Sequence, residues 1–266
     1  MLTEFFFSLI GGVFAVLGTG RLEQIAWRFL RTVGALQVAL SAFTIVWMIR
    51  FQTVPPEISS LAVYILAGLA AFCSFGIMFF SPVANRNKSL FRLFCGVGAL
   101  SSLALAAIYA ISTLPADGTS VALQAAVVLS RITGALLIGS ITVAWMLGHA
   151  YLTATRMTIA PLRHFSSMLS WSVILRFATV LVSVAIALLP FGTGVPWERL
   201  ADAWLVVSLR VGVGLLALAI FAYMVADCVK LRSTQSATGI LYFGSVFAYV
   251  GELASQHLVA ECAWPM

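Results

Sequence analysis

Long apolar stretches alternate with short polar segments from one end of the chain to the other. Each apolar stretch is long enough to cross the hydrocarbon core of a bilayer, which takes about 20 helical residues. The pattern predicts an all-α, polytopic integral membrane protein, built as a bundle of about eight transmembrane helices with short loops. We expect the helices at residues 3–20, 32–50, 58–80, 91–113, 122–154, 165–190, 202–228 and 237–260.

Basic residues gather in every second loop. Ten of the fifteen Lys and Arg residues follow the first, third, fifth and seventh stretches: Arg21, Arg28, Arg31, Arg86, Lys88, Arg92, Arg156, Arg163, Lys230 and Arg232. The other loops carry only Arg50 and Arg199, together with the acidic residues Glu57, Asp117, Glu198 and Asp202. Because cytoplasmic loops of membrane proteins are enriched in Lys and Arg, we expect a plasma or inner membrane protein with both termini on the outer side.

The composition agrees with a membrane protein and excludes other classes. Hydrophobic residues make up 62% of the chain and charged residues 9%, whereas a soluble domain carries roughly 25% charged residues. The net charge of +6 is explained by the basic loops, so we expect no nucleic-acid partner. Glu4 stands where a signal peptide would carry positive charge, and we therefore interpret the first stretch as a retained helix.

We expect one transmembrane domain over residues 1–266, with a weak sign of internal duplication. The segments RLEQIAWRF at 21–29 and RMTIAPLRHF at 156–165 are similar, and both join an outside-in helix to an inside-out helix. A four-plus-four repeat relating residues 1–113 to 122–260 would explain the match, although basic turns resemble one another in any case.

Small residues form a stripe along the fourth predicted helix. They recur at four-residue spacing, at Gly98, Ser102, Ala106 and Ala110, and so lie on one helix face. In membranes such faces allow helices to approach closely. We predict that this helix packs against a neighbour through the stripe.

Four charged residues lie well inside predicted spans, away from the helix ends: Arg131, Arg176, Arg210 and Glu252. A charge in hydrocarbon costs roughly 2.5–3.5 kcal/mol on insertion scales, so each needs a partner or water. In one interpretation Glu252 pairs with an arginine, with Arg210 favoured and Arg131 the other choice, and the remaining arginines bond carbonyls or reach the interface. In the other, Arg131 and Arg176 are surplus cations that bind an anionic group of a lipid, cofactor, partner subunit or transported solute, because the guanidinium fork suits carboxylate and phosphate.

His149 and Tyr151 are the candidate cofactor-binding residues. They follow Gly148 near the inner end of the fifth predicted helix, where a neutral imidazole could bond a quinone carbonyl, ligate a haem iron or contact a pigment shared with a partner subunit. A bis-histidine haem within the chain is disfavoured, because His257 lies at the opposite depth and His164 lies close to a loop. The alternative is a histidine that bonds a headgroup or a loop carbonyl.

No catalytic or metal-binding motif is present. The four cysteines form no CxxC pair, and HExxH, GxSxG and Walker A patterns are lacking. We therefore expect a membrane subunit of a larger respiratory or photosynthetic electron-transport complex, which acts as a scaffold and contacts lipid or cofactor in the bilayer. The alternative is a small transporter or channel for an anionic solute or lipid, and an enzyme is the least favoured class.

Overall fold

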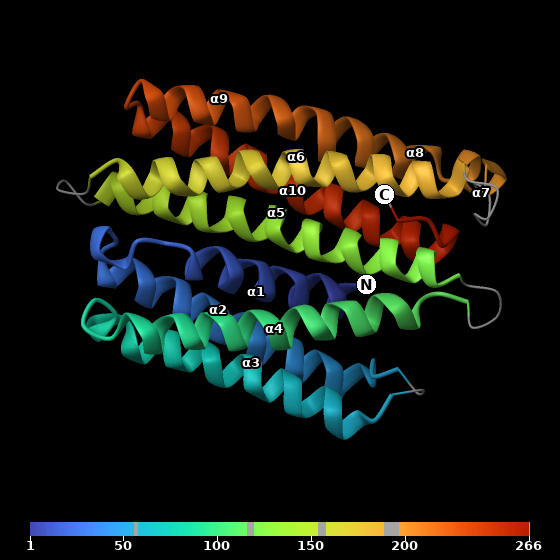
Figure 1. Ribbon diagram of the computed structural model, residues 1–266, viewed down its shortest axis with the longest axis horizontal. Coiled ribbons are helices and arrows are strands. Elements are labelled where there is room, and N and C mark those ends of the chain that lie inside the picture. The colour runs from blue at the N-terminus through green and yellow to red at the C-terminus, as the bar shows by residue number, and fades with distance from the viewer. Residues whose placement is uncertain (56–57, 116–119, 154–157, 189–196, 266) are drawn as a thin grey trace.

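The computed structural model describes residues 1–55, 58–115, 120–153, 158–188 and 197–265, and the regular structure in these residues is entirely helical (Figure 1). The elements, in chain order, are α1 (Leu2–Gly18), η1 (Leu22–Gln24), α2 (Trp27–Phe51), α3 (Ser60–Phe80), η2 (Ser81–Val83), α4 (Lys88–Ser112), α5 (Val121–Thr153), α6 (Ala160–Leu188), α7 (Trp197–Asp202), α8 (Trp204–Ser208), η3 (Leu209–Ala217), α9 (Leu218–Lys230) and α10 (Thr234–Cys262).

The predicted multi-pass membrane fold is confirmed. Within the described residues, seven helices are long and apolar enough to cross a membrane. The remaining predicted span, the first in the chain, is α1. It is an apolar helix of 17 residues that is about 25 Å long and therefore shorter than the others. The residues that the structure describes thus form a bundle of seven long apolar helices and the shorter α1.

The chain passes up and down, so its connections gather at two ends (Figure 1). We call them the η1 end, where α1 meets α2 and α3 meets α4, and the α7 end, where α7 and the C-terminus lie. The basic connections predicted to be cytoplasmic are at the η1 end, apart from Arg156, which is outside the described residues, as are Glu57 and Asp117. Which end faces the cytoplasm stays a prediction.

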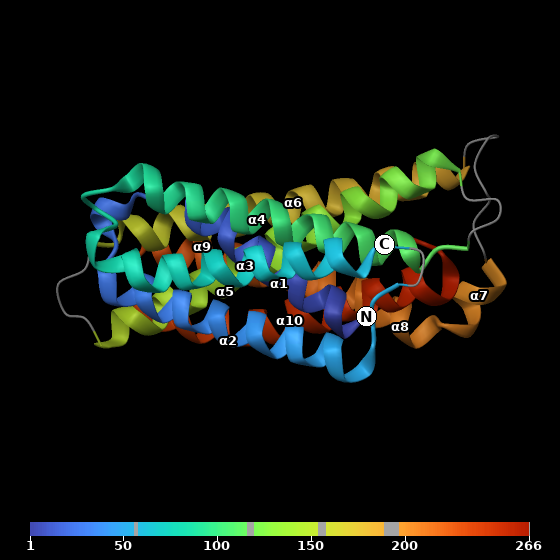
Figure 2. The same ribbon diagram turned by 90° about the horizontal axis from the view of Figure 1, so that it is seen from below.

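Helices α1–α4 form one group and α5–α10 the other, and α1 and α5 lie at the seam between them (Figures 1 and 2). The two backbones touch there, since a Cβ atom on Gly12 would lie 1.8 Å from the carbonyl oxygen of Ala135. Most of α1 is buried as a result, including Phe7 and Phe14. The duplication suggested by the sequence stays a prediction.

The small-residue stripe on α4 packs as predicted. Ser102, Ala106 and Ala110 are fully buried, and a Cβ atom on Gly98 would lie 2.7 Å from the ring of Phe14 on α1. The close neighbour of this face is therefore the short central helix α1, against which α4 packs extensively.

The seventh predicted span, 202–228, differs from a single regular helix. The chain forms α7, breaks at Ala203, and then runs through α8, η3 and α9 as one apolar rod from Trp204 to Lys230. The middle segment η3 is a π-helix, with a wider turn than an α-helix. Such segments are rare in proteins, but those that occur often lie at functional sites. This one carries Arg210.

Candidate functional site

Five charged side chains from five helical segments are buried in the half of the bundle nearer the α7 end. They are Glu4 of α1, Arg131 of α5, Arg176 of α6, Arg210 of η3 and Glu252 of α10, and none is more than 3% exposed. Arg131 and Glu252 each lie about 15 Å along their helices from the end. We call these five residues the charge network.

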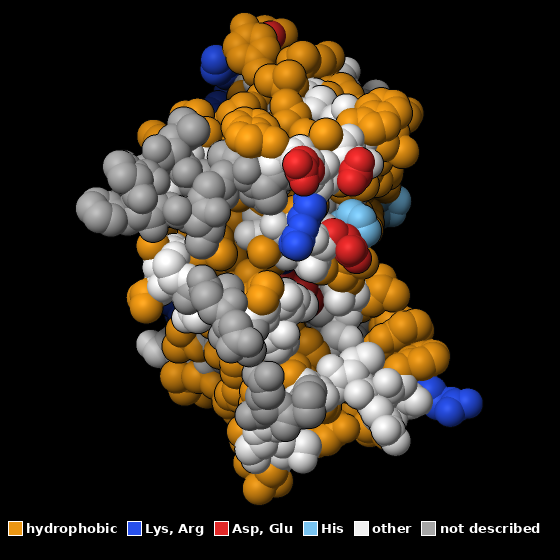
Figure 3. All heavy atoms as spheres, turned by 90° about the vertical axis from the view of Figure 1, so that its right-hand side faces the viewer, with side chains coloured by type: hydrophobic (Ala, Val, Ile, Leu, Met, Phe, Trp, Pro, Cys, Tyr) orange, Lys and Arg blue, Asp and Glu red, His pale blue; other side chains and the backbone are white. Residues whose placement is uncertain are grey.

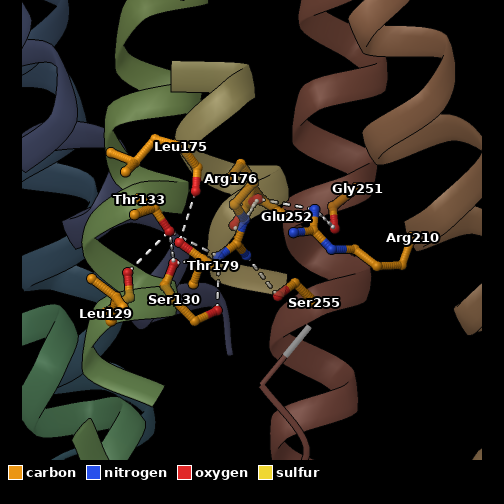
Figure 4. Close-up of polar contacts among 10 residues, drawn as sticks. All are labelled: Leu129, Ser130, Thr133, Leu175, Arg176, Thr179, Arg210, Gly251, Glu252 and Ser255. Carbon is orange, nitrogen blue, oxygen red and sulfur yellow. Dashed lines mark hydrogen bonds and ion pairs between the residues drawn. The ribbon is translucent and has the colours of Figure 1, made fainter. Parts of the chain in front are cut away.

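Arg176 is the centre of the network (Figure 4). Its Nε and Nη2 atoms donate to the two carboxylate oxygens of Glu252, at 2.9 and 3.0 Å, which is the bidentate geometry favoured by a guanidinium. Nη1 donates to the carbonyl and hydroxyl oxygens of Ser130, at 2.6 and 2.8 Å, and to Thr133. Nη2 also donates to Ser255. The side chain is therefore fully engaged by α5 and α10.

Arg210 reaches the same carboxylate from the other side (Figure 4). Its Nη1 atom donates to Oε1 of Glu252 at 3.1 Å and to the carbonyl oxygen of Gly251 at 3.4 Å. A close backbone crossing permits this reach, because a Cβ atom on Gly251 would lie 2.3 Å from the Cα of Gly214. The predicted pairing of Glu252 with Arg210 is confirmed, although Arg176 makes the more extensive contact.

Arg131 pairs with Glu4, its Nε atom lying 2.5 Å from Oε1. Arg131 and Arg176 thus each face a carboxylate of the same chain, and their binding of an anionic group from a lipid, cofactor or partner stays a prediction. Glu4 was missed because it was assigned to the N-terminal edge of a full-length span. Because α1 is short, its first turn places Glu4 deep in the bundle, within ion-pair distance of Arg131.

Gly134 makes room for the central carboxylate. A Cβ atom at this position on α5 would lie 2.1 Å from Oε2 of Glu252. The carboxylate thus rests against bare backbone, one turn from Ser130, which bonds Arg176. The close contact of α5 and α10 at this point sets the position of the Glu252 carboxylate, to which both Arg176 and Arg210 donate hydrogen bonds.

The network has more positive than negative groups. Three arginines face two carboxylates, so one positive charge is in excess when all five are ionised. Among the described residues, Nη1 and Nη2 of Arg131 and Nε and Nη2 of Arg210 have no hydrogen-bond partner although they are buried. Buried donors normally have acceptors, so these four nitrogens are the unsatisfied groups of the network.

His149 lies elsewhere, in the half of the bundle nearer the η1 end. Its Nδ1 atom is 2.9 Å from the hydroxyl of Tyr242 on α10, and both residues line a pocket of about 420 Å³ between α2, α5 and α10. Tyr151, the other candidate, instead donates its hydroxyl to the carbonyl oxygen of Thr158. The structure therefore brings His149 together with Tyr242 and not with Tyr151.

A pattern on α10 points to Tyr242. Tyr242, Tyr249 and Gln256 recur at seven-residue spacing and so share one face of the helix. The hydroxyl of Tyr249 is 2.8 Å from that of Thr142 on α5. The polar face of α10 thus meets α5 along both the pocket and the network.

The other two histidines have different neighbours from those of His149. His164 is bonded through Nε2 to the hydroxyl of Thr19, at 3.1 Å, and lines a basic pocket of about 340 Å³ at the η1 end, together with Arg21 and Arg163. His257 lines a pocket of about 680 Å³ at the α7 end, where acidic and basic side chains gather on the surface (Figure 3). That the chain forms no bis-histidine haem site stays a prediction.

The described residues contain no group of three or more His, Cys, Asp or Glu side chains that could hold a metal ion. The candidate sites are therefore the charge network and the pocket at His149. Comparison with family models, with curated proteins and with solved structures found no match to this chain.

Proposed function

We propose that this protein is a non-catalytic integral membrane subunit of a larger membrane complex, which gives the complex a rigid helical scaffold and contacts a lipid-soluble cofactor. One observation carries the proposal: the five side chains of the charge network form ion pairs with one another across five helical segments. Respiratory and photosynthetic electron transport are the processes that combine such subunits with lipid-soluble cofactors, and we place the proposal there.

The network resists the movements that a carrier needs. Moving α6 or η3 away from α10 would break the contacts of Arg176 or Arg210 with Glu252, and leaving such a charge unpaired typically costs about 3–5 kcal/mol. Moving α1 away from α5 would likewise separate Glu4 from Arg131. Pairs that tie so many helices together favour a static subunit over a protein that alternates between two open states.

A second candidate function is favoured by the excess positive charge. The unpartnered nitrogens of Arg131 and Arg210 are suited to an anion, as expected of a small transporter or channel for an anionic solute or lipid. This candidate requires an anion to reach a network whose members are at most 3% exposed. It therefore also requires an opening movement of the helices.

Purification in a mild detergent from the native membrane separates the two candidates. The subunit proposal expects other membrane proteins to co-purify in fixed proportion and expects thermal stability to be the same in chloride and in gluconate. An isolated monomer or homodimer whose melting temperature rises with chloride or phosphate would overturn it in favour of anion binding.

A further inference from the structure

The pocket between α2, α5 and α10 has the mixed lining of a site for a ring compound. Apolar side chains, among them Phe29, Trp145 and Met146, form most of its wall. Its volume of about 420 Å³ is within the range of roughly 300–1,000 Å³ that is usual for small-molecule sites. A flat apolar molecule with one polar edge would therefore match the wall better than a solvated ion.

Two aromatic rings form one side of the pocket. The centroids of Trp145 and Tyr242 are 5.3 Å apart with an interplanar angle of 39°, and Tyr242 is 40% exposed. Planar ligands stack on exposed aromatic faces of this kind, because ring pairs at this separation attract each other. Tyr242 is thus exposed enough for a second ring to lie against it.

A hydrogen-bond donor lies at the same wall. The hydroxyl of Tyr242 and Nδ1 of His149 are bonded, and when the hydroxyl donates, the imidazole proton is on Nε2. The bond to Tyr242 uses Nδ1, which leaves Nε2 for another partner. Because His149 is exposed, Nε2 is then an N–H donor that a ligand carbonyl can reach.

The depth of the pocket suits a lipid-soluble molecule. His149 is about 6 Å from the described end of α5, and Arg28 is the second residue of α2. The pocket thus lies close to the level where hydrocarbon meets headgroups, with Arg28 at its polar edge. A ring placed there keeps its oxygens near water and its tail among the lipids.

We propose that this pocket binds the headgroup of a quinone, with Nε2 of His149 donating to a quinone carbonyl, the ring lying against Tyr242 and Trp145, and the isoprenoid tail in the bilayer. The proposal rests on the proposed function, because it names the lipid-soluble cofactor that the subunit contacts. A bis-histidine haem fits less well, since His164 bonds Thr19 and does not line this pocket. An anionic lipid would match the basic pocket at Arg21 and Arg163 better.

The test is titration of the purified chain, in detergent micelles, with decylubiquinone, read as quenching of tryptophan fluorescence. We expect saturable quenching that is weakened about tenfold in His149→Ala, which is the size of one lost hydrogen bond. Tyr242→Phe keeps the ring and removes the hydroxyl, so it should also weaken binding. Trp145→Phe should remove most of the saturable signal.

The matched control is Tyr223→Phe, which removes a hydroxyl from a tyrosine that is 71% exposed and does not line the pocket. Its binding curve should equal that of the unaltered chain. Quenching that never saturates would overturn the quinone site, as would quenching that is the same in His149→Ala and Tyr242→Phe as in the control. Suppression of the quenching by phosphatidylglycerol alone would also overturn it. Because the titration uses the isolated chain, its failure is distinct from a failure to co-purify with partners.

Discussion

The charge network and the His149 pocket use the same two helices in different ways. At Gly134 and Glu252, α5 and α10 touch so closely that a carboxylate rests on bare backbone. Toward the η1 end the same helices present His149 and Tyr242 to an open pocket. Charges deep in a bilayer need partners, whereas polar groups near its edge can stay available to a ligand. We therefore expect the first region to hold the fold together and the second to be free to bind a ligand.

The comparison predicts its largest effect for Glu252→Gln. This change leaves Arg176 and Arg210 facing a neutral amide, and breaking a buried pair typically costs about 3–5 kcal/mol. We expect a clear fall in the midpoint of thermal unfolding in detergent. A second change, Arg176→Gln, should recover more of the loss than Arg210→Gln, since Arg176 makes the two-pronged contact.

Equal recovery by the two arginine changes would show that the bidentate pair is not the centre of the network. Unchanged stability of the single variant would break the comparison altogether, because the network would then contribute nothing to the fold.

Glu4→Gln is the next largest expected effect. It removes the partner of Arg131, and we expect a cost of about 2–4 kcal/mol, since the nearby Glu252 still offsets part of the charge. Adding Arg131→Gln should restore much of the stability, because the unpaired cation is gone. The double-mutant cycle measures this coupling. A strictly additive double variant would mean that the pair does not form.

Gly134→Ala tests the contact of backbone and carboxylate. The added methyl group would lie 2.1 Å from Oε2 of Glu252, so we expect a loss of about 1–3 kcal/mol. Gly68→Ala is the matched control, because a Cβ atom there meets nothing within 4 Å and alanine favours a helix. The shifts in the midpoint of thermal unfolding should have opposite signs in the two variants. Equal shifts would argue against the tight crossing of α5 and α10.

Substitutions in the pocket should hardly change stability. His149 is exposed and Tyr242 is 40% exposed, so His149→Ala and Tyr242→Phe are each expected to shift the free energy of unfolding by less than about 0.5 kcal/mol. The same thermal unfolding assay measures them. A loss as large as that of Glu4→Gln would show that the pocket residues hold the bundle together and are not reserved for a ligand.

A labelling experiment on intact cells decides which region is nearer the outside, with no effect on stability expected. A membrane-impermeant thiol reagent should modify cysteine in Glu261→Cys, near the charge network, and spare Asn87→Cys, at the η1 end. Both positions are exposed, whereas the native Cys262 is 4% exposed and is a poor reporter. Modification of Asn87→Cys alone would reverse the predicted orientation.

Local pattern was enough to predict the fold class. Transmembrane helices satisfy their backbone hydrogen bonds within each segment, so apolar length alone marks them. The small face of α4 was predictable for the same reason, because four-residue spacing places Gly98 and Ala106 on one side of a helix. No sequence pattern predicts the short length of α1 or the π-helix at Arg210, because both depend on how neighbouring helices pack.

The sequence by itself determined that the chain is a membrane bundle, that its basic loops gather at one end, and that Arg131, Arg176, Arg210 and Glu252 must find partners. Only the tertiary structure decided which partners they have. Pairing depends on which helices adjoin and at what depth each side chain lies, and neither is encoded in the period of a single helix. Glu4 met Arg131 because α1 begins inside the bundle beside α5. His149 contacts Tyr242 because α10 packs against α5 at the depth of His149.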